Sequence, residues 1–111
     1  MNIDDIYLSV AKNIVSSIES NWELAQINFE YYGSAAEYHG RFYQVGSDEA
    51  QNFKVGYSTY KLFKKLHEIT TENNSNNWNR AVFNLKPTGE FNIDFSWGQE
   101  LADEIERLTD E

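Results

Sequence analysis

Residues 87–99 read Pro-Thr-Gly-Glu-Phe-Asn-Ile-Asp-Phe-Ser-Trp-Gly-Gln. Three apolar residues of this stretch alternate with polar ones: Phe91, Ile93 and Phe95. That period of two is typical of a β-strand with one buried face. Proline fixes φ and Gly89 permits a positive φ, so a tight turn is expected before the strand. With residues 78–85 as its partner strand, the stretch predicts a β-hairpin whose Phe-Ile-Phe face builds the core.

The same alternation recurs nearer the N-terminus. Residues 24–32 alternate apolar and polar side chains, which predicts a further strand. A turn at residues 33–34 separates it from a second strand that continues to Phe42. Residues 53–55 indicate a short third strand. Strand by strand, the pattern predicts an antiparallel sheet of four to five strands.

Helical spacing of apolar residues predicts three helices. The first follows a cap at Asn2 and carries Ile3, Ile6, Tyr7, Val10, Ile14 and Ile18 on one face. The second covers about residues 58–71, and a polar loop over 72–77 follows it. Ser96 and Gln99 have the spacing of a capping box, which places Trp97 in the first turn of the third helix. That helix carries Leu101, Ile105 and Leu108. The fold class is therefore α+β, with helices packed on an antiparallel sheet and the order α-β-β-(β)-α-β-β-α.

Composition narrows the possible functions. A chain of 111 residues is expected to form a single domain over 1–111. It has no cysteine, which excludes disulfides and thiol chemistry and fits a cytoplasmic protein. No apolar run is long enough for a membrane span. The net charge of −9 argues against nucleic acid as a ligand, because binding phosphates requires basic side chains.

Residues with catalytic potential do not form a recognisable motif. His39 and His67 lie in different expected elements, and His67 is expected at the boundary of a helix. Glu90 and Asp94 share one face of a strand, but four residues separate them by roughly 13 Å. Glycosidase carboxylates lie about 5 to 9.5 Å apart. We therefore expect no catalytic residue, no cofactor, no metal site and no enzymatic activity.

Acidic residues gather at the C-terminal end of the chain. Residues 99–111 contain six of them against Arg107 alone, a local charge of −5: Glu100, Asp103, Glu104, Glu106, Asp110 and Glu111. Near a helix C-terminus the macrodipole disfavours negative charge, so helix stability alone does not explain this pattern. Two interpretations stay open: a solvated helix face, or an acidic patch that faces a basic partner. Adjacent aromatic pairs such as Tyr31-Tyr32 also predict that one ring of each pair points away from the core.

Several aromatic anchors follow one another in a fixed order along the chain. Trp22 opens the first strand and Trp78 opens Trp-Asn-Arg-Ala-Val-Phe-Asn-Leu, and residues 89–97 then read Gly-Glu-Phe-Asn-Ile-Asp-Phe-Ser-Trp. In this order the anchors resemble the YezG-like immunity protein family of bacterial antitoxins, whose signature is Gly-x-Phe-x-Ile-Asp-Phe-x-aromatic. Trp97 stands where the pattern more usually has tyrosine, and residues 43–57 are short for the family. These anchors span roughly residues 1–98.

The resemblance implies a cytoplasmic protein that binds and neutralises one cognate toxin domain, a nuclease with a basic surface. Charge and face position nominate the contact residues: Glu90, Asp94, Trp97, Glu100, Asp103 and Glu104. No nucleic acid or membrane is expected among the partners. The alternative is a module that binds a small ligand or peptide through an aromatic sheet face. The sequence leaves the oligomeric state and the toxin's identity open.

Overall fold

The computed structural model describes residues 2–32, 36–72 and 77–109, apart from the side chains of residues 105, 108 and 109. Within these ranges the chain forms three helices and five strands. Their order is α1 (Ile3–Ser17), β1 (Trp22–Tyr31), β2 (Ala36–Gln44), β3 (Ala50–Phe53), α2 (Tyr57–Thr70), β4 (Arg80–Leu85), β5 (Phe91–Ser96) and α3 (Gln99–Thr109). This confirms the α+β class and the predicted order, including the optional third strand.

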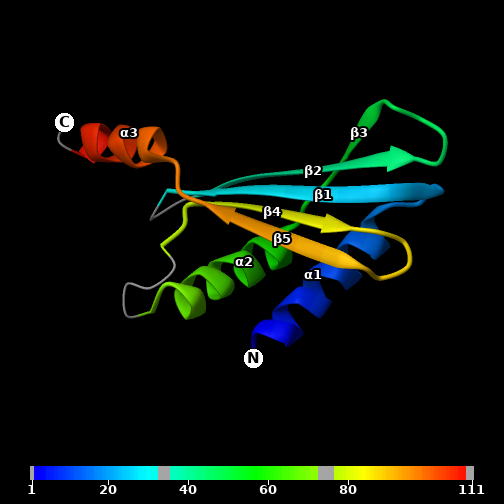
Figure 1. The fold of residues 1–111 in the computed structure, drawn as a ribbon, viewed down its shortest axis with the longest axis horizontal. Coiled ribbons are helices and arrows are strands. Elements are labelled where there is room, and N and C mark those ends of the chain that lie inside the picture. The colour runs from blue at the N-terminus through cyan, green and yellow to red at the C-terminus, as the bar shows by residue number, and fades with distance from the viewer. Residues whose placement is uncertain (1, 33–35, 73–76, 110–111) are drawn as a thin grey trace.

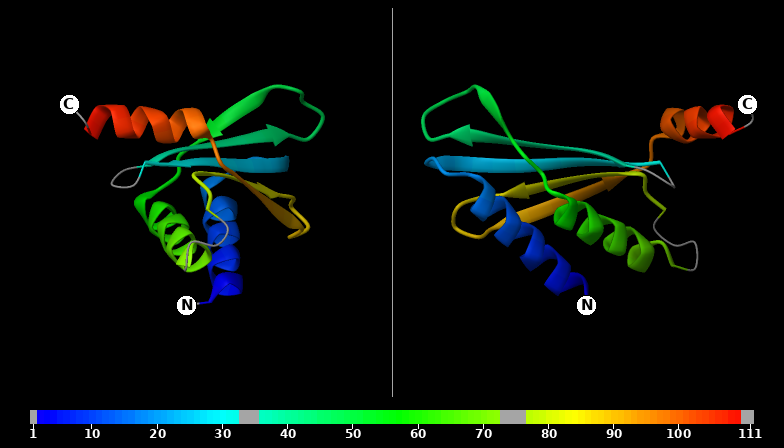
Figure 2. Two further views of the ribbon diagram at one scale, coloured as in Figure 1. Left: turned by 60° about the vertical axis from the view of Figure 1, so that its left-hand side comes forward. Right: turned by 180° about the vertical axis from the view of Figure 1, so that it is seen from behind.

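The strands form one antiparallel sheet in the order β3-β2-β1-β4-β5. Helices α1 and α2 cover one face of this sheet, whereas α3 lies beyond the end of β5, toward the opposite face (Figures 1 and 2). We call the face away from α1 and α2 the open face. In β1, Ala25, Ile27 and Phe29 point to the helices and are buried, and the residues between them belong to the open face.

The core forms between α1, α2 and the covered face. Asn2 caps α1 as predicted, its Oδ1 accepting a hydrogen bond from the Asp5 N–H at 2.8 Å. The ring of Phe29 in β1 stacks on Phe63 of α2, with ring centroids 4.9 Å apart. Between the two helices, Asn13 Nδ2 donates to Thr59 Oγ1 at 2.9 Å, which satisfies a buried hydroxyl. Apolar packing and this polar link hold α1 against α2.

The predicted hairpin forms with the expected turn. Gly89 has a φ of +95°, and its N–H donates to the Lys86 carbonyl at 2.9 Å. The apolar face of β5 is oriented as predicted, but the prediction that this face builds the core is only partly correct. Phe91 is 45% exposed and Phe95 is 39% exposed, while Ile93 is half-buried. The reason is that β5 is an edge strand, which the helices cover incompletely.

Several boundaries differ from the sequence expectations. The short strand β3 covers residues 50–53 instead of 53–55, and β4 begins at Arg80 instead of residue 78. Trp22 opens β1, as the family resemblance implied. The capping box at Ser96 was wrong, because Ser96 is the last residue of β5 and α3 begins only at Gln99. Trp97 therefore lies between the strand and the helix. The turn expected at residues 33–34 falls outside the described residues, as does most of the loop expected over 72–77.

Candidate functional site

The open face of the sheet carries a row of amide side chains. Register places Gln26 of β1 beside Asn84 of β4, and Asn84 beside Asn92 of β5. Gln26 Nε2 donates to Asn84 Oδ1 at 2.7 Å, and Asn84 Nδ2 donates to Asn92 Oδ1 at 2.8 Å. Arg41 of β2 continues the row on the other side of Gln26. The sequence reasoning missed this row, since it depends on which strands are neighbours.

An ionic cluster joins the open face to α3. Arg80 Nε lies 3.0 Å from Glu30 Oε2, and its NH1 lies 2.6 Å from Glu100 Oε1. The pKa of Glu100 is lowered, first by a hydrogen bond from its own backbone N–H and then by the Arg80 guanidinium. The bonds from Glu100 and Glu30 in turn raise the pKa of Arg80. Arg80 thus holds one carboxylate from the sheet and one from the first turn of α3.

A buried asparagine fixes the corner between β5 and α3. Asn79 Nδ2 donates to the Gly98 carbonyl at 2.9 Å, and the Gly98 N–H donates to Asn79 Oδ1 at 2.7 Å. Both backbone groups of Gly98 are satisfied by this one side chain. Next to it, Trp97 Nε1 donates to Gln99 Oε1 at 2.9 Å, and Gln99 Nε2 donates to Asp103 Oδ1 at 2.9 Å. These contacts set where α3 leaves the sheet.

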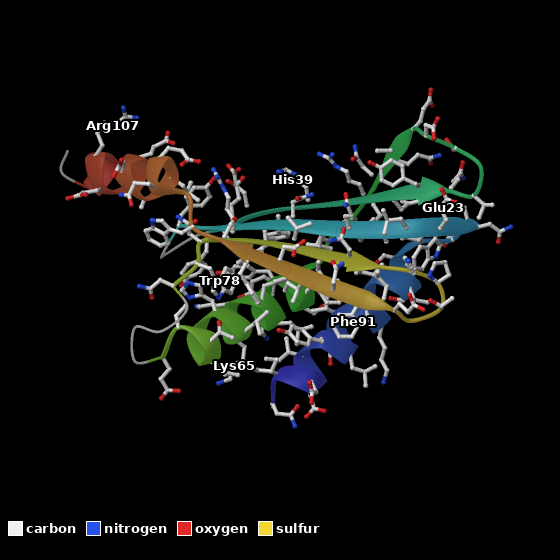
Figure 3. The ribbon with its side chains drawn as sticks, in the orientation of Figure 1. Glu23, His39, Lys65, Trp78, Phe91 and Arg107 are labelled. Atoms are coloured by element: carbon white, nitrogen blue, oxygen red, sulfur yellow. The ribbon has the colours of Figure 1, made fainter. Side chains whose placement is uncertain are left out.

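The structure places the nominated contact residues in two groups. Trp97 is 51% exposed between β5 and α3. Glu100, Asp103, Glu104 and Arg107 line one shallow hollow on α3. Figure 3 labels Arg107 on α3, well away from the β-hairpin.

Glu90 forms the second group, at the hairpin end of β5. Its Oε2 lies 3.8 Å from Lys86 Nζ. Seven residues of extended chain separate Glu90 from Trp97, a distance of roughly 23 Å. Asp94 lies between them, exposed on the open face and opposite Val82 in the register. The nominated residues therefore form a line along β5 and α3, and not one compact patch.

The aromatic pairs divide between the two faces as predicted. Phe42 is buried against the core while its neighbour Tyr43 lies on the open face, and Tyr31 packs against His67 on the helix side. Most other open-face positions of the described strands hold polar side chains. The open face of the described strands is therefore not the aromatic surface that the small-ligand alternative requires.

The two histidines lie on opposite sides of the sheet. Figure 3 shows His39 on the open face, whereas His67 belongs to α2 on the covered side. His67 Nε2 lies 2.9 Å from the Trp78 carbonyl oxygen, and burial lowers its pKa. This matches the expectation of a boundary histidine. Among the described residues, no group of His, Asp and Glu side chains is arranged to hold a metal ion.

The described residues also include no helix that is long and apolar enough to cross a membrane. Fold and surface together define a small α+β domain with one covered sheet face, a polar open face and an acidic helix at its edge. A polar and charged surface of this kind is open to contact with another protein.

Comparison with known proteins narrows this class. The chain is similar to the immunity protein YezG of Bacillus spizizenii, with 26% identity over 116 residues that cover 91% of this chain and 72% of that protein. No family model matches the chain. The similarity confirms the resemblance to the YezG-like immunity protein family and supports the expectation that the chain is not an enzyme.

Proposed function

We propose that this chain is an immunity protein that binds and neutralises a cognate toxin domain in the cytoplasm of the cell that makes it. The observation that carries the proposal is the similarity to an immunity protein over nine-tenths of the chain. The surface agrees with it, because α3 presents the exposed carboxylates of Glu100, Asp103 and Glu104 around one hollow. Neutralisation then operates by protein–protein binding.

The proposed partner is a nuclease domain with a basic surface. A nuclease must hold phosphates, so its substrate groove is typically basic. The chain's net charge of −9 is complementary to such a groove and would speed the encounter. Nucleic acid and membrane are not partners in this proposal. It assigns the contact to Glu90, Asp94, Trp97, Glu100, Asp103 and Glu104.

The acidic helix surface supports this assignment. Glu100, Asp103 and Glu104 lie on one side of α3 and share a hollow with Arg107. The ion pairs of Glu100 and Glu104 are exposed, with Glu104 Oε1 3.9 Å from Arg107 NH2, and exposed pairs exchange partners at little cost. A basic partner can therefore compete for these carboxylates.

Pull-down and cell rescue test the proposal. The bait is the C-terminal domain of a large protein encoded beside this gene, and rescue is growth of cells that express that domain. We expect the wild-type chain to bind and to restore growth. Binding without rescue, or neither, would contradict the proposal.

A matched pair of variants tests the nominated surface. The triple variant Glu100→Gln, Asp103→Asn and Glu104→Gln neutralises the α3 acids. Its control, Glu23→Gln, Asp48→Asn and Glu49→Gln, removes the same charge from exposed positions outside the nominated surface. We expect the first to weaken binding by about tenfold or more and the control to change it much less. Equal losses would mean that only net charge matters.

A further inference from the structure

One edge of the sheet is open to strand pairing. Strand β5 ends the strand order and pairs with β4 alone among the described strands. The Lys86 N–H donates to the Glu90 carbonyl at 2.8 Å, so these two residues form a hydrogen-bonded pair. Such pairs alternate along an antiparallel ladder, which directs the backbone N–H and C=O groups of Phe91, Ile93 and Phe95 away from β4. These groups point to the free edge.

The covered side of this edge is apolar. Phe91 packs on Tyr7 of α1, with ring centroids 5.4 Å apart, yet it stays 45% exposed. Ala11 and Val15 of α1 form an apolar hollow with Leu85 and Pro87 of the hairpin. Figure 3 labels Phe91 where β5 passes α1. At the other end, Phe95 and Trp97 line a second hollow with Trp78. An added strand would therefore bury apolar surface along the length of β5.

The open-face side of the same edge is acidic and polar. Glu90, Asn92 and Asp94 alternate with the apolar residues and are all exposed. Among the described residues, Lys86 offsets part of this charge, with its Nζ 3.8 Å from Glu90 Oε2. A strand laid against β5 keeps its side chains in the same alternation. Its matching pattern is an apolar residue on the helix side and a basic residue on the open-face side.

The opposite edge of the sheet lacks these features. Strand β3 has four residues, and three of them, Ala50, Gln51 and Asn52, are exposed and carry no large apolar side chain. Short polar edges are a common protection against unwanted pairing. Of the two edge strands, β5 is therefore the better site for pairing with an added strand.

A second copy of the chain is a poor occupant. In antiparallel pairing of two β5 strands, the residues of one face lie opposite residues of the same face. The carboxylates of Glu90 and Asp94 would then meet those of the other copy, and like charges facing each other destabilise a sheet. Two chains of net charge −9 also repel at long range.

We propose that β5 binds an extended segment of the toxin domain as a sixth strand, with alternating apolar and basic side chains. This inference rests on the proposed function and gives its contact a specific geometry. Backbone hydrogen bonds supply part of the binding, and the apolar and acidic sides of β5 select the sequence of the segment.

Hydrogen exchange of backbone amides tests the geometry. In the complex with the toxin domain, we expect the amides of Phe91, Ile93 and Phe95 to become protected, while those of β3 do not change. Tight binding with the β5 amides unprotected would overturn the inference and leave the proposed function standing. Concentration-dependent self-association that protects the same amides would overturn the choice of occupant.

A synthetic probe separates this inference from the proposed function. The probe is an octapeptide of alternating valine and lysine, and its control alternates valine and glutamate. We expect the lysine peptide alone to protect the β5 amides. That result would support the inference even where the toxin domain fails to bind. Failure of both the toxin domain and the lysine peptide to protect β5 would contradict it.

Two variants of one residue isolate the backbone contribution. Ile93→Ala and Ile93→Pro both shorten the side chain, but only proline removes the outward N–H, and neither removes a bond to β4. We expect Ile93→Pro to bind the toxin domain or the lysine peptide about tenfold more weakly than Ile93→Ala. Equal affinities would argue against strand addition. Should Ile93→Pro unfold, the Ile93 amide of the wild-type chain decides instead: its protection by the lysine peptide would support strand addition, and its continued exchange in the presence of bound peptide would argue against it.

Discussion

Asn79 shows how one residue can position a whole helix. Its side chain is 4% exposed and holds both backbone groups of Gly98, directly before α3. No other side chain of the corner supplies these two bonds in the described structure. Asn79, which directly precedes β4, therefore helps to set the position of the acidic surface of α3.

We expect Asn79→Ala to lower the free energy of unfolding by about 1–3 kcal/mol, because it leaves the buried N–H of Gly98 unsatisfied, whereas the Gly98 carbonyl still accepts from the Ala102 N–H at 3.2 Å. Chemical denaturation measures the loss. Asn84→Ala is the control, since Asn84 also bonds to two amides but on the solvent-facing side of the sheet. A loss for Asn79→Ala no larger than for the control would contradict the role assigned to the corner.

His67 makes stability depend on pH. Burial lowers its pKa from the ordinary 6.5, although the Trp78 carbonyl and Glu68 act in the opposite direction. The unfolded chain therefore takes up a proton near pH 6.5 that the folded protein resists. The contribution to stability is complete above that pH and is lost as the pH falls toward the folded pKa.

Replacing the imidazole should remove this dependence. We expect the melting temperature of the wild type to fall further between about pH 7.5 and about pH 5.5 than that of His67→Gln, whose amide can still donate to the Trp78 carbonyl. Carboxylates titrate in both proteins, so the difference between the two slopes isolates His67. Parallel slopes would refute the assignment.

At the scale of elements, β4 and β5 differ in what their phenylalanines do. Phe83 of the inner strand β4 is fully buried, and its ring stacks on Phe91 of the edge strand β5 with centroids 5.3 Å apart. The same residue type is thus a core residue in β4 and a partly exposed residue in β5. Strand order, not the local pattern, makes this difference.

We expect Phe83→Ala to destabilise the fold by about 3–5 kcal/mol, because it opens a cavity in the core. Phe91→Ala should cost clearly less, since nearly half of its ring is already in water. Denaturant titration of both variants compares them directly. Equal costs would mean that Phe91 is a core residue and would weaken the case for a free apolar edge.

At the scale of the whole molecule, charge governs the approach of a partner. The chain carries 18 acidic and 9 basic residues, and acids lie both along β5 and on α3. Long-range attraction of a basic toxin domain should therefore raise the association rate. In the complex proposed above, short-range contacts at the edge strand would then govern the dissociation rate.

We expect the association rate constant with the toxin domain to fall by about tenfold or more from roughly 20 mM to roughly 500 mM salt, while the dissociation rate changes little. Stopped-flow fluorescence of the exposed Trp97 can follow both rates. A Trp97→Phe variant is the control that identifies the signal. An association rate that is independent of salt would contradict electrostatic steering.

Local patterns predicted most of the elements. Alternation along β1 and β5 and helical spacing along α1 depend only on each residue's near neighbours, so they can be read without knowing the fold. The cap at Asn2 and the turn at Gly89 were predictable for the same reason. The helix cap predicted at Ser96 was wrong, because strand β5 continues to that residue despite the capping-box spacing of Ser96 and Gln99.

Much of the candidate site depends on contacts between distant residues. The sequence by itself determined which side chains of a strand share a face, because the period of two is a property of the extended backbone. Only the tertiary structure decided that β5 lies at an edge, that Arg80 joins Glu30 to Glu100, and that Asn79 sets the position of α3. These features join residues that are far apart in the chain, and their pairing is fixed by how the strands and helices pack together.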